Sequence, residues 1–179
     1  MDLRITAGEF KNRRLASLPG KELRPLSGRI KEALFSIISE IIPGAVFLDL
    51  FAGTGNVGFE ALSRGASKAF LVEKDPASLR LIRKNIEILG VSDRVEMYSC
   101  DVFDFHRDLS ADIIFAGPPY RPNLTSRILT HCRDSRIIRA GSLLIIQHHR
   151  KEPVEHSGYE ISDSRTYGIT TLDFFRLKE

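Results

Sequence analysis

The residues that raise a chemical question end one apolar segment, "ADIIFAGPPYRP", residues 111–122. Each proline fixes its own backbone and pushes the residue before it towards an extended conformation. The chain should therefore leave a strand as a stiff segment that ends in an aromatic ring. Backbone carbonyls held in this way could accept hydrogen bonds from the amino group of a nucleobase, and the ring could stack on a flipped base. The candidate catalytic residues are Gly117, Pro118, Pro119 and Tyr120.

A second candidate site lies in "DLFAGTGNVG", residues 49–58. Gly53, Gly55 and Gly58 match the G-x-G-x-x-G pattern between an expected strand and an expected helix. Glu73, 20 residues after Gly53, fits the acid that binds a ribose diol in dinucleotide sites. A nicotinamide or flavin oxidoreductase is therefore one alternative that the pattern leaves open.

Asp49, directly before this loop, argues against a dinucleotide. A pyrophosphate beside a carboxylate would be repelled by about 1 kcal/mol or more, whereas a ligand with an ammonium group would be attracted. S-adenosylmethionine is such a ligand and carries no phosphate. Asp101 could then accept a hydrogen bond from the adenine amine and the Val102 amide could reach a ring nitrogen, although Asp101 would also suit a helix N-cap.

The elements that must position these residues alternate along the chain. Apolar strands are expected at 45–50, 68–73, 94–99, 111–116 and 141–147, with helices between them. This alternation predicts an α/β fold with a mostly parallel, seven-stranded sheet covered by helices on both faces, once "GYEIS" and "TTLDFFRLK" add a closing antiparallel pair. Ligands bind such sheets beyond the carboxyl ends of the strands, where both candidate sites fall.

Residues 1–43 are expected to form an N-terminal extension, a hairpin and a helix, and residues 44–179 the domain that would bind S-adenosylmethionine. Segments 3–7 and 13–18 predict a β-hairpin. A helix should begin after Ser27 and end before Pro43, with an apolar stripe of Ile30, Ala33, Leu34, Ile37, Ile38 and Ile41. Residues 1–31 contain eight basic and three acidic side chains, a net charge of +5, against −2 for the rest. This asymmetry favours a segment that binds a polyanion.

The composition is that of one ordinary globular domain, with 42% apolar and 27% charged residues in 179. No apolar run reaches the roughly 18 residues of a membrane span, and the N-terminus shows no signal peptide. Cys100 and Cys132 lack metal-site spacing and are expected to be reduced thiols of a cytoplasmic protein. His148 and His149 follow the fifth expected strand, but no second catalytic partner is evident near them.

Longer stretches resemble one known family. "RITAGEFKNRRL", "RPLSGRIKEALFSII", "LDLFAGTGNVGFEALSRGA", "VEKD" and "YGITTLDFF" are similar to the RsmD family, bacterial 16S rRNA guanine-N2 methyltransferases of the class I, S-adenosylmethionine-dependent type. The resemblance runs from about Leu3 to Phe175. It implies a Rossmann-like methyltransferase fold and a substrate guanine in the small ribosomal subunit or its assembly intermediate, with no metal and no membrane partner, in a chain expected to be monomeric.

The resemblance also implies roles for individual residues. The cofactor pocket should be lined by Asp49, Phe51, Gly53, Gly55, Glu73, Lys74, Asp101 and Val102. The guanine should face Pro118, Pro119 and Tyr120. The expected RNA phosphate contacts are Arg4, Lys11, Arg13, Arg14, Arg24 and Arg29, which agree with the charge asymmetry found without the family.

Three positions depart from the family pattern. The family usually reads R-P-T-S-D-R, whereas this chain has Leu26 and Gly28 in place of the threonine and the aspartate. Gly117 stands where the family has the aspartate of D-P-P-Y or D-P-P-F, whose side chain is expected to accept a proton of the target amine. Losing such an acceptor commonly costs about 10² to 10³ in rate. A water or a carboxylate from elsewhere could fill the gap.

Two other functions remain open from the sequence. The first is a non-catalytic ribosome assembly factor that retains the methyltransferase fold, with which glycine at position 117 is compatible. An amino-methyltransferase that acts on another nucleic acid base, such as adenine in DNA, is the other, although 179 residues leave no room for a target-recognition region.

Overall fold

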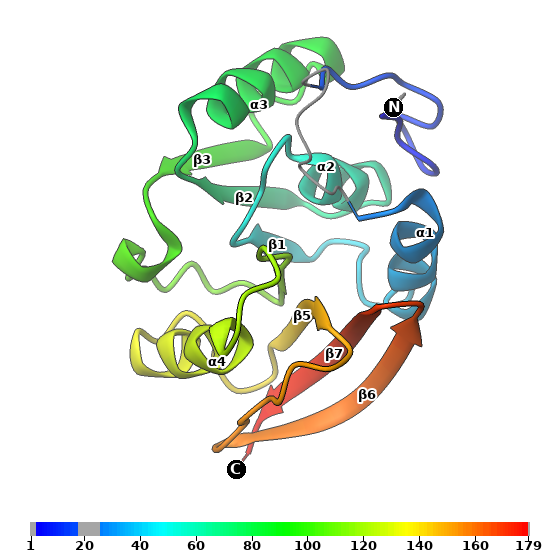
Figure 1. The fold of residues 1–179 in the computed structure, drawn as a ribbon. Helices are drawn as coiled ribbons and strands as arrows, with labels where there is room; N and C mark the ends of the chain where they lie inside the picture. The colour runs from blue at the N-terminus through cyan, green and yellow to red at the C-terminus, as the bar shows by residue number, and fades with distance from the viewer. Residues whose placement is uncertain (1–2, 18–25, 179) are drawn as a thin grey trace.

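The protein, described here as a computed structural model, is resolved in detail for residues 3–17 and 26–178. One sheet of seven strands, in the order β3-β2-β1-β4-β5-β7-β6, forms its centre (Figure 1). The strands are β1 Val46–Asp49, β2 Lys68–Glu73, β3 Val95–Ser99, β4 Ile113–Ala116, β5 Leu143–His149, β6 Tyr159–Tyr167 and β7 Thr170–Leu177. The first five are parallel, and β7 runs antiparallel to both β5 and β6. The predicted sheet is confirmed.

Helices cover both faces of this sheet, because its central strands are apolar on both sides. The helices are α1 Gly28–Ile37, α2 Asn56–Ser63, α3 Pro76–Leu89 and α4 Leu124–Asp134, with a short 3₁₀ turn, η1, at Val102–Asp104. In Figure 1, α1, α2 and α3 lie on one side of the sheet and α4 on the other. Alternate residues of each strand therefore enter two separate apolar clusters.

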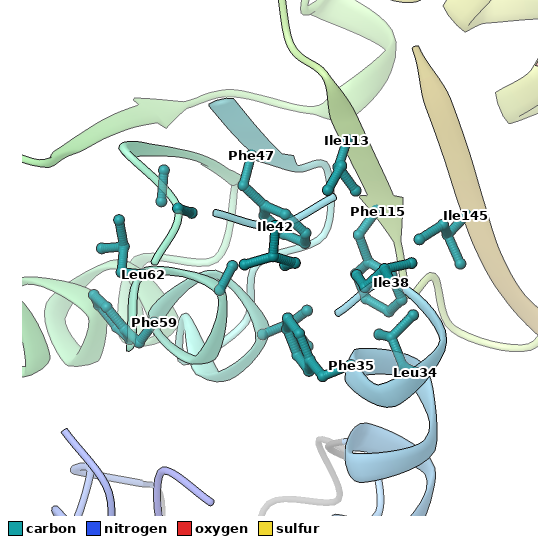
Figure 2. Close-up of a cluster of buried hydrophobic side chains, with 14 of the residues drawn as sticks. Leu34, Phe35, Ile38, Ile42, Phe47, Phe59, Leu62, Ile113, Phe115 and Ile145 are labelled. Carbon is teal, nitrogen blue, oxygen red and sulfur yellow. The ribbon is translucent and has the colours of Figure 1, made fainter. Parts of the chain in front are cut away.

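The larger cluster joins α1 to the sheet (Figure 2). Leu34, Phe35 and Ile38 pack against Phe47 and Phe115, and the Phe35 and Phe47 rings stack with their centroids 6.4 Å apart. The N-terminal extension therefore shares its apolar core with the central sheet. The division of the chain at residue 43 stays a prediction.

Helix α1 differs from the expected one in length and in orientation. The Ser27 hydroxyl accepts from the Ile30 amide at 3.3 Å, as the N-cap prediction required. The helix ends at Ile37, however, and Ile37 and Ile41 are 39% and 44% exposed. Phe35, which the predicted stripe left out, is fully buried instead. The large ring fills the core better than the two isoleucines, so the helix turns that face towards the sheet.

The predicted N-terminal hairpin is present in a minimal form. Arg4 and Arg14 form a single antiparallel bridge. The Ile5 amide donates to the Arg13 carbonyl at 3.1 Å, and the Leu15 amide donates to the Leu3 carbonyl at 2.8 Å. These bonds fold residues 3–17 back on themselves beside α2 and α3 (Figure 1).

Candidate active site

Two glycines, Gly55 in the loop between β1 and α2 and Gly58 within α2, could not carry a side chain without displacing their neighbours. Gly55 has φ +80°, and a Cβ there would meet the Phe59 ring at 2.3 Å. A Cβ on Gly58 would lie 2.4 Å from a methyl of Leu71, so this glycine lets α2 pack closely on β2. The G-x-G-x-x-G spacing therefore has a structural origin in this chain, in a tight turn and a close helix–strand contact.

Asp49 ends β1 as a carboxylate that is 1% exposed. Its Oδ1 accepts a long hydrogen bond of 3.3 Å from the Phe51 amide. Burial raises the pKa of Asp49 to about 7, helped by the nearby charge of Glu73 and opposed by the backbone amides. Within residues 3–17 and 26–178, no cationic side chain pairs with this buried carboxylate, which favours a positively charged ligand group.

Glu73, at the end of β2, closes the loop from the other side. One carboxylate oxygen accepts from the Gly53 amide at 2.8 Å, and the other accepts from the Lys74 and Asp75 amides at 2.8 Å each. Three backbone donors hold this half-buried carboxylate in one position. A carboxylate has about four acceptor positions, so it can still receive a hydroxyl of a ribose.

Asp101 and Lys74 form an ion pair across the ends of β3 and β2. The Lys74 ammonium lies 2.6 Å from Asp101 Oδ2, while Asp101 Oδ1 accepts from the Phe103 amide and caps η1. The adjacent Lys74 holds the pKa of Asp101 below its ordinary value. The capping role considered from the sequence is therefore present, and a ligand amine would have to compete with Lys74 for the second oxygen.

The Gly117–Tyr120 segment leaves β4 beside the Asp49 loop. β4 pairs with β1, and the Leu50 amide donates to the Phe115 carbonyl at 2.9 Å, just before the segment begins. Pro118 is buried, whereas Pro119 is exposed and Tyr120 is half-buried. The two candidate sites predicted separately from the sequence are thus on neighbouring strand ends.

Two residues around Tyr120, Gln147 and Thr170, were missed from the sequence, and the third, His149, was noted there without a partner. The Tyr120 and Thr170 hydroxyl oxygens lie 2.5 Å apart, Gln147 Nε2 donates to the Tyr120 hydroxyl at 3.2 Å, and the His149 ring packs edge-on against Tyr120 at 5.7 Å. Thr170 lies in the family-like stretch "YGITTLDFF", and Gln147 directly precedes the pair His148 and His149. The pairing of β5 with β4 and of β7 with β5 brings these residues beside the end of β4, and a correct prediction of that strand order could have found them.

The basic residues predicted to contact RNA do not form one group. The turn that carries Lys11 and Arg13 lies at the amino edge of the sheet: Arg13 donates to the Ile88 carbonyl at the end of α3, and Glu9 pairs with Arg94 before β3. Arg4 and Arg14 are exposed on the bridge between. Arg24 lies outside the described residues.

Arg29 is exposed at the start of α1, on the side of the β6–β7 turn. It lines an open cleft of about 370 Å³ between the start of α1 and the β6–β7 turn, together with Ser27, Ile30, Thr166, Tyr167 and Gly168. β7 starts at Thr170, whose hydroxyl meets Tyr120, so this cleft leads towards the Gly117–Tyr120 segment. Lys31, counted in the basic extension, is 2% exposed and pairs with Glu60, so it contributes nothing to a basic surface.

The residues at the strand ends fit S-adenosylmethionine. Asp49 offers a buried carboxylate to its ammonium group, and Glu73 offers a fixed acceptor to its ribose hydroxyls. A Cβ added at Gly53 would have open space within 4 Å, so the loop leaves room on that side. Lys74 is the cation in this set, and it is already paired with Asp101. Among the described residues, the buried carboxylate beside the glycine loop therefore favours a ligand without a phosphate there.

Comparison with known proteins identifies the family. The family model described as Conserved hypothetical protein 95 matches residues 3–176. The chain belongs to this family, the RsmD family. An RsmD relative from Escherichia coli, "Ribosomal RNA small subunit methyltransferase D", is 32% identical over 146 residues, which cover 81% of this chain and 74% of the relative. The protein of the same name from Haemophilus influenzae is 28% identical over 98% of this chain and 94% of its own.

Solved structures agree with the RsmD fold. "Putative methyltransferase yhhF from Escherichia coli" superposes with a TM-score of 0.88 at 26% identity and covers 99% of both chains. An RNA methyltransferase from Salinibacter ruber, solved in complex with S-adenosyl-L-homocysteine, matches with a TM-score of 0.71 at 16% identity, over 87% of this chain and 94% of its own. The Rossmann-like methyltransferase fold predicted from the sequence is confirmed.

Other features of the RsmD-family chain bear on the remaining predictions. Cys100 and Cys132 are free thiols, and burial raises the pKa of Cys132 to about 12, so this thiol stays protonated. In residues 3–17 and 26–178, no helix combines the length and apolar character needed to cross a membrane. The same residues contain no group of three His, Cys, Asp or Glu side chains that could hold a metal ion.

Proposed function

We propose that this protein transfers a methyl group from S-adenosylmethionine to the exocyclic N2 amine of a guanine in 16S rRNA, within the small ribosomal subunit or its assembly intermediate. The names of the E. coli and H. influenzae relatives support an rRNA substrate. The observation that carries the proposal is the adjacency of two strand ends: β1 ends in the buried Asp49, and the neighbouring β4 ends in the Gly117–Tyr120 segment.

The chain's own residues would divide the work between these two strand ends. S-adenosylmethionine, when bound, supplies a methyl group on a positively charged sulfur. Asp49 binds the ammonium of the donor and Glu73 its ribose, which fixes the donor in the loop. Tyr120 stacks on the guanine, and the carbonyls around Pro118 and Pro119 accept from its amine, so that the nitrogen lone pair faces the methyl carbon. This alignment replaces a bimolecular encounter with a fixed approach.

The proton of the methylated amine passes to solvent in this scheme. Gly117, Pro118 and Pro119 carry no titratable side chain, and Tyr120 is engaged with Thr170 and Gln147. His148 is 4% exposed and hydrogen-bonded to Asp173 at 2.8 Å, so it belongs to the β5–β7 pairing. Positioning and desolvation, with no strong base, would therefore account for the rate.

The test is transfer of radiolabelled methyl from S-adenosylmethionine to small subunits that lack the modification, by the protein as it stands and by Gly117→Asp. We expect label on guanine N2 with the unaltered protein. Label on another base would redirect the proposal to a different amino-methyltransferase, and no label with either protein would refute it.

A second candidate function, a non-catalytic assembly factor, rests on Gly117 alone. It predicts that the unaltered protein binds small subunits and S-adenosylmethionine but transfers no label, whereas Gly117→Asp regains transfer. Binding measured alongside transfer therefore separates the two functions.

A further inference from the structure

Gln147 is the neighbour of Gly117 on the adjacent strand. The parallel register pairs Phe115 with Ile145 and Ala116 with Ile146, so the next pair along β4 and β5 is Gly117 and Gln147. Side chains alternate between the faces of a sheet. Figure 2 shows Phe115 and Ile145 pointing to the same face, towards α1. A side chain at position 117 would therefore share that face with Gln147.

The distances agree with this register. A Cβ added at Gly117 would lie 3.5 Å from Oε1 of Gln147, and 3.1 and 3.4 Å from two atoms of the Phe115 ring. The amide oxygen of Gln147 thus borders the space in which a side chain at position 117 would begin. The aspartate that the family carries there would start from this space.

The hydrogen bonds of Gln147 fix which of its atoms is available. Its Nε2 donates to the Tyr120 hydroxyl oxygen at 3.2 Å. The Tyr120 hydroxyl makes its second hydrogen bond with the Thr170 hydroxyl, whose oxygen lies 2.5 Å away, and either hydroxyl can be the donor. Among the described residues, Oε1 of Gln147 has no hydrogen-bond donor, and the side chain is half-buried. A neutral oxygen acceptor is therefore held at the edge of the site by the same ring that would stack on the base.

We propose that Gln147 Oε1 takes the place of the missing aspartate oxygen and accepts a hydrogen bond from the N2 amine of the target guanine. The proposal rests on the proposed function. The amine lone pair attacks the methyl carbon and forms the N–C bond, and the electrons of the breaking S–C bond return to sulfur. The methylated nitrogen then loses its proton to water, because an amide accepts a hydrogen bond without taking up the proton.

The neutrality of the amide distinguishes this arrangement from a carboxylate. Gln147 does not titrate, so it adds no pH dependence to methyl transfer. In Gln147→Glu the acceptor would titrate, and the donor to Tyr120 would be lost at pH values where the carboxyl is ionised. The rate of this variant should fall below that of the unaltered protein as pH drops through the carboxyl pKa.

The experiment is single-turnover methyl transfer to unmodified small subunits at saturating S-adenosylmethionine. It compares the unaltered protein with Gln147→Met, Gln147→Glu, Tyr120→Phe and the double variant Gln147→Met/Gly117→Asp. We expect kcat of Gln147→Met to fall by about 10² to 10³, the usual cost of removing one preorganised hydrogen-bonding group from an active site. The Kd for S-adenosylmethionine should stay within about twofold, and a thermal melt checks that the variant is folded.

Two comparisons separate direct contact from a structural role. Tyr120→Phe removes the hydroxyl that Gln147 holds but leaves Oε1 in the chain, so it should cost less than Gln147→Met. The double variant should be more active than Gln147→Met, because the new carboxylate at position 117 supplies the lost acceptor. The Phe115 ring, 3.1 Å from the added Cβ, would have to move by a few tenths of an ångström.

The failures are distinguishable. If the unaltered protein transfers no label, the proposed function fails. If only Gly117→Asp transfers label, Gln147 does not replace the aspartate. If the unaltered protein is active and Gln147→Met keeps its kcat, or loses no more than Tyr120→Phe, the inference is wrong while the function stands. Should Gln147→Met not fold, the near-isosteric Gln147→Glu decides by its pH–rate profile: a profile identical to that of the unaltered protein overturns the inference.

Discussion

Asp49 shows at the scale of one residue how burial can prepare a site for a charged ligand. Burial raises its pKa to about 7, far above the ordinary value near 3.8. The group is therefore largely protonated at pH 6 and ionised at pH 8. Ionisation costs free energy in this buried position, and a ligand ammonium would repay that cost through a charged hydrogen bond.

This residue predicts a pH-dependent affinity for the cofactor. The Kd for S-adenosylhomocysteine should rise by up to about tenfold per pH unit as pH falls below 7, because protonated Asp49 does not attract the ammonium. Titration calorimetry at pH 6.5 in buffers of different ionisation enthalpy should show proton release on binding. In Asp49→Asn the affinity should be about tenfold to a hundredfold lower. An unchanged pH slope in that variant would rule out Asp49 as the titrating group.

At the scale of elements, α1 and the N-terminal hairpin are joined to α2 by a buried charge network. Glu60 is fully buried and lies 2.8 Å from the Lys31 ammonium and 2.9 Å from Arg64 Nε. It also accepts from the Thr6 amide at 2.9 Å. The Lys31 ammonium donates in turn to the Asn56 side chain, at the start of α2 beside the glycine loop. The extension is thus coupled to the glycine loop.

The network predicts a large stability cost for Glu60→Gln. Burial disfavours the charge of Glu60, but the hydrogen bond and charge of Lys31 outweigh it and hold the pKa of Glu60 below its ordinary value. Removing this partner leaves a buried ammonium uncompensated, which costs about 3–5 kcal/mol of unfolding free energy. Urea denaturation measures it. Glu32→Gln, the same change at an exposed position of α1, should stay within about 0.5 kcal/mol; equal effects would contradict the coupling.

The pairing of β5 with β7 contains a second buried pair, which predicts how stability responds to pH. Burial alone would lower the pKa of His148, but its hydrogen bond to Asp173 outweighs this and raises the pKa above 6.5. The stabilisation is therefore complete below pH 6.5 and is lost as pH rises through the raised pKa. The melting temperature of Asp173→Asn should fall furthest below that of the unaltered protein at pH 6, with a smaller gap at pH 9. Asp134→Asn, which removes an exposed pair with Arg133, should show a gap that does not change.

The strands show what the sequence could and could not predict. Continuous apolar runs such as 111–116 identify a buried strand without further information, and the glycine spacing identifies the loop after β1. The neighbour of Gly117 could not be found in this way, because it depends on the register of β4 with β5, and the two segments lie about 30 residues apart in the sequence. The α1 stripe failed for a related reason: the choice between Phe35 and Ile37 was made by packing against Phe47.

At the scale of the whole molecule, the basic charge of the N-terminal extension is spread over two ends of the fold. Lys11 and Arg13 lie on the turn at the amino edge of the sheet, whereas Arg29 lines the cleft beside the β6–β7 turn. A charge count along the sequence cannot separate these positions. An RNA that presents a base to Tyr120 would approach from the side of the cleft, so Arg29 should contribute most to productive binding.

This arrangement predicts different costs for equal changes of charge. Arg29→Gln should lower kcat/KM for small subunits more than Lys11→Gln, and should reduce the slope of log affinity against log salt concentration by about 1 for a lost phosphate contact. Arg139→Gln, an exposed arginine that pairs with Asp112 at the amino edge, serves as the matched control and should change neither. Filter binding and methyl transfer between 50 and 200 mM salt measure both quantities. If Lys11→Gln costs as much as Arg29→Gln, the RNA extends over both edges of the sheet; if Arg139→Gln does too, the effect is one of net charge and the cleft is not the route to Tyr120.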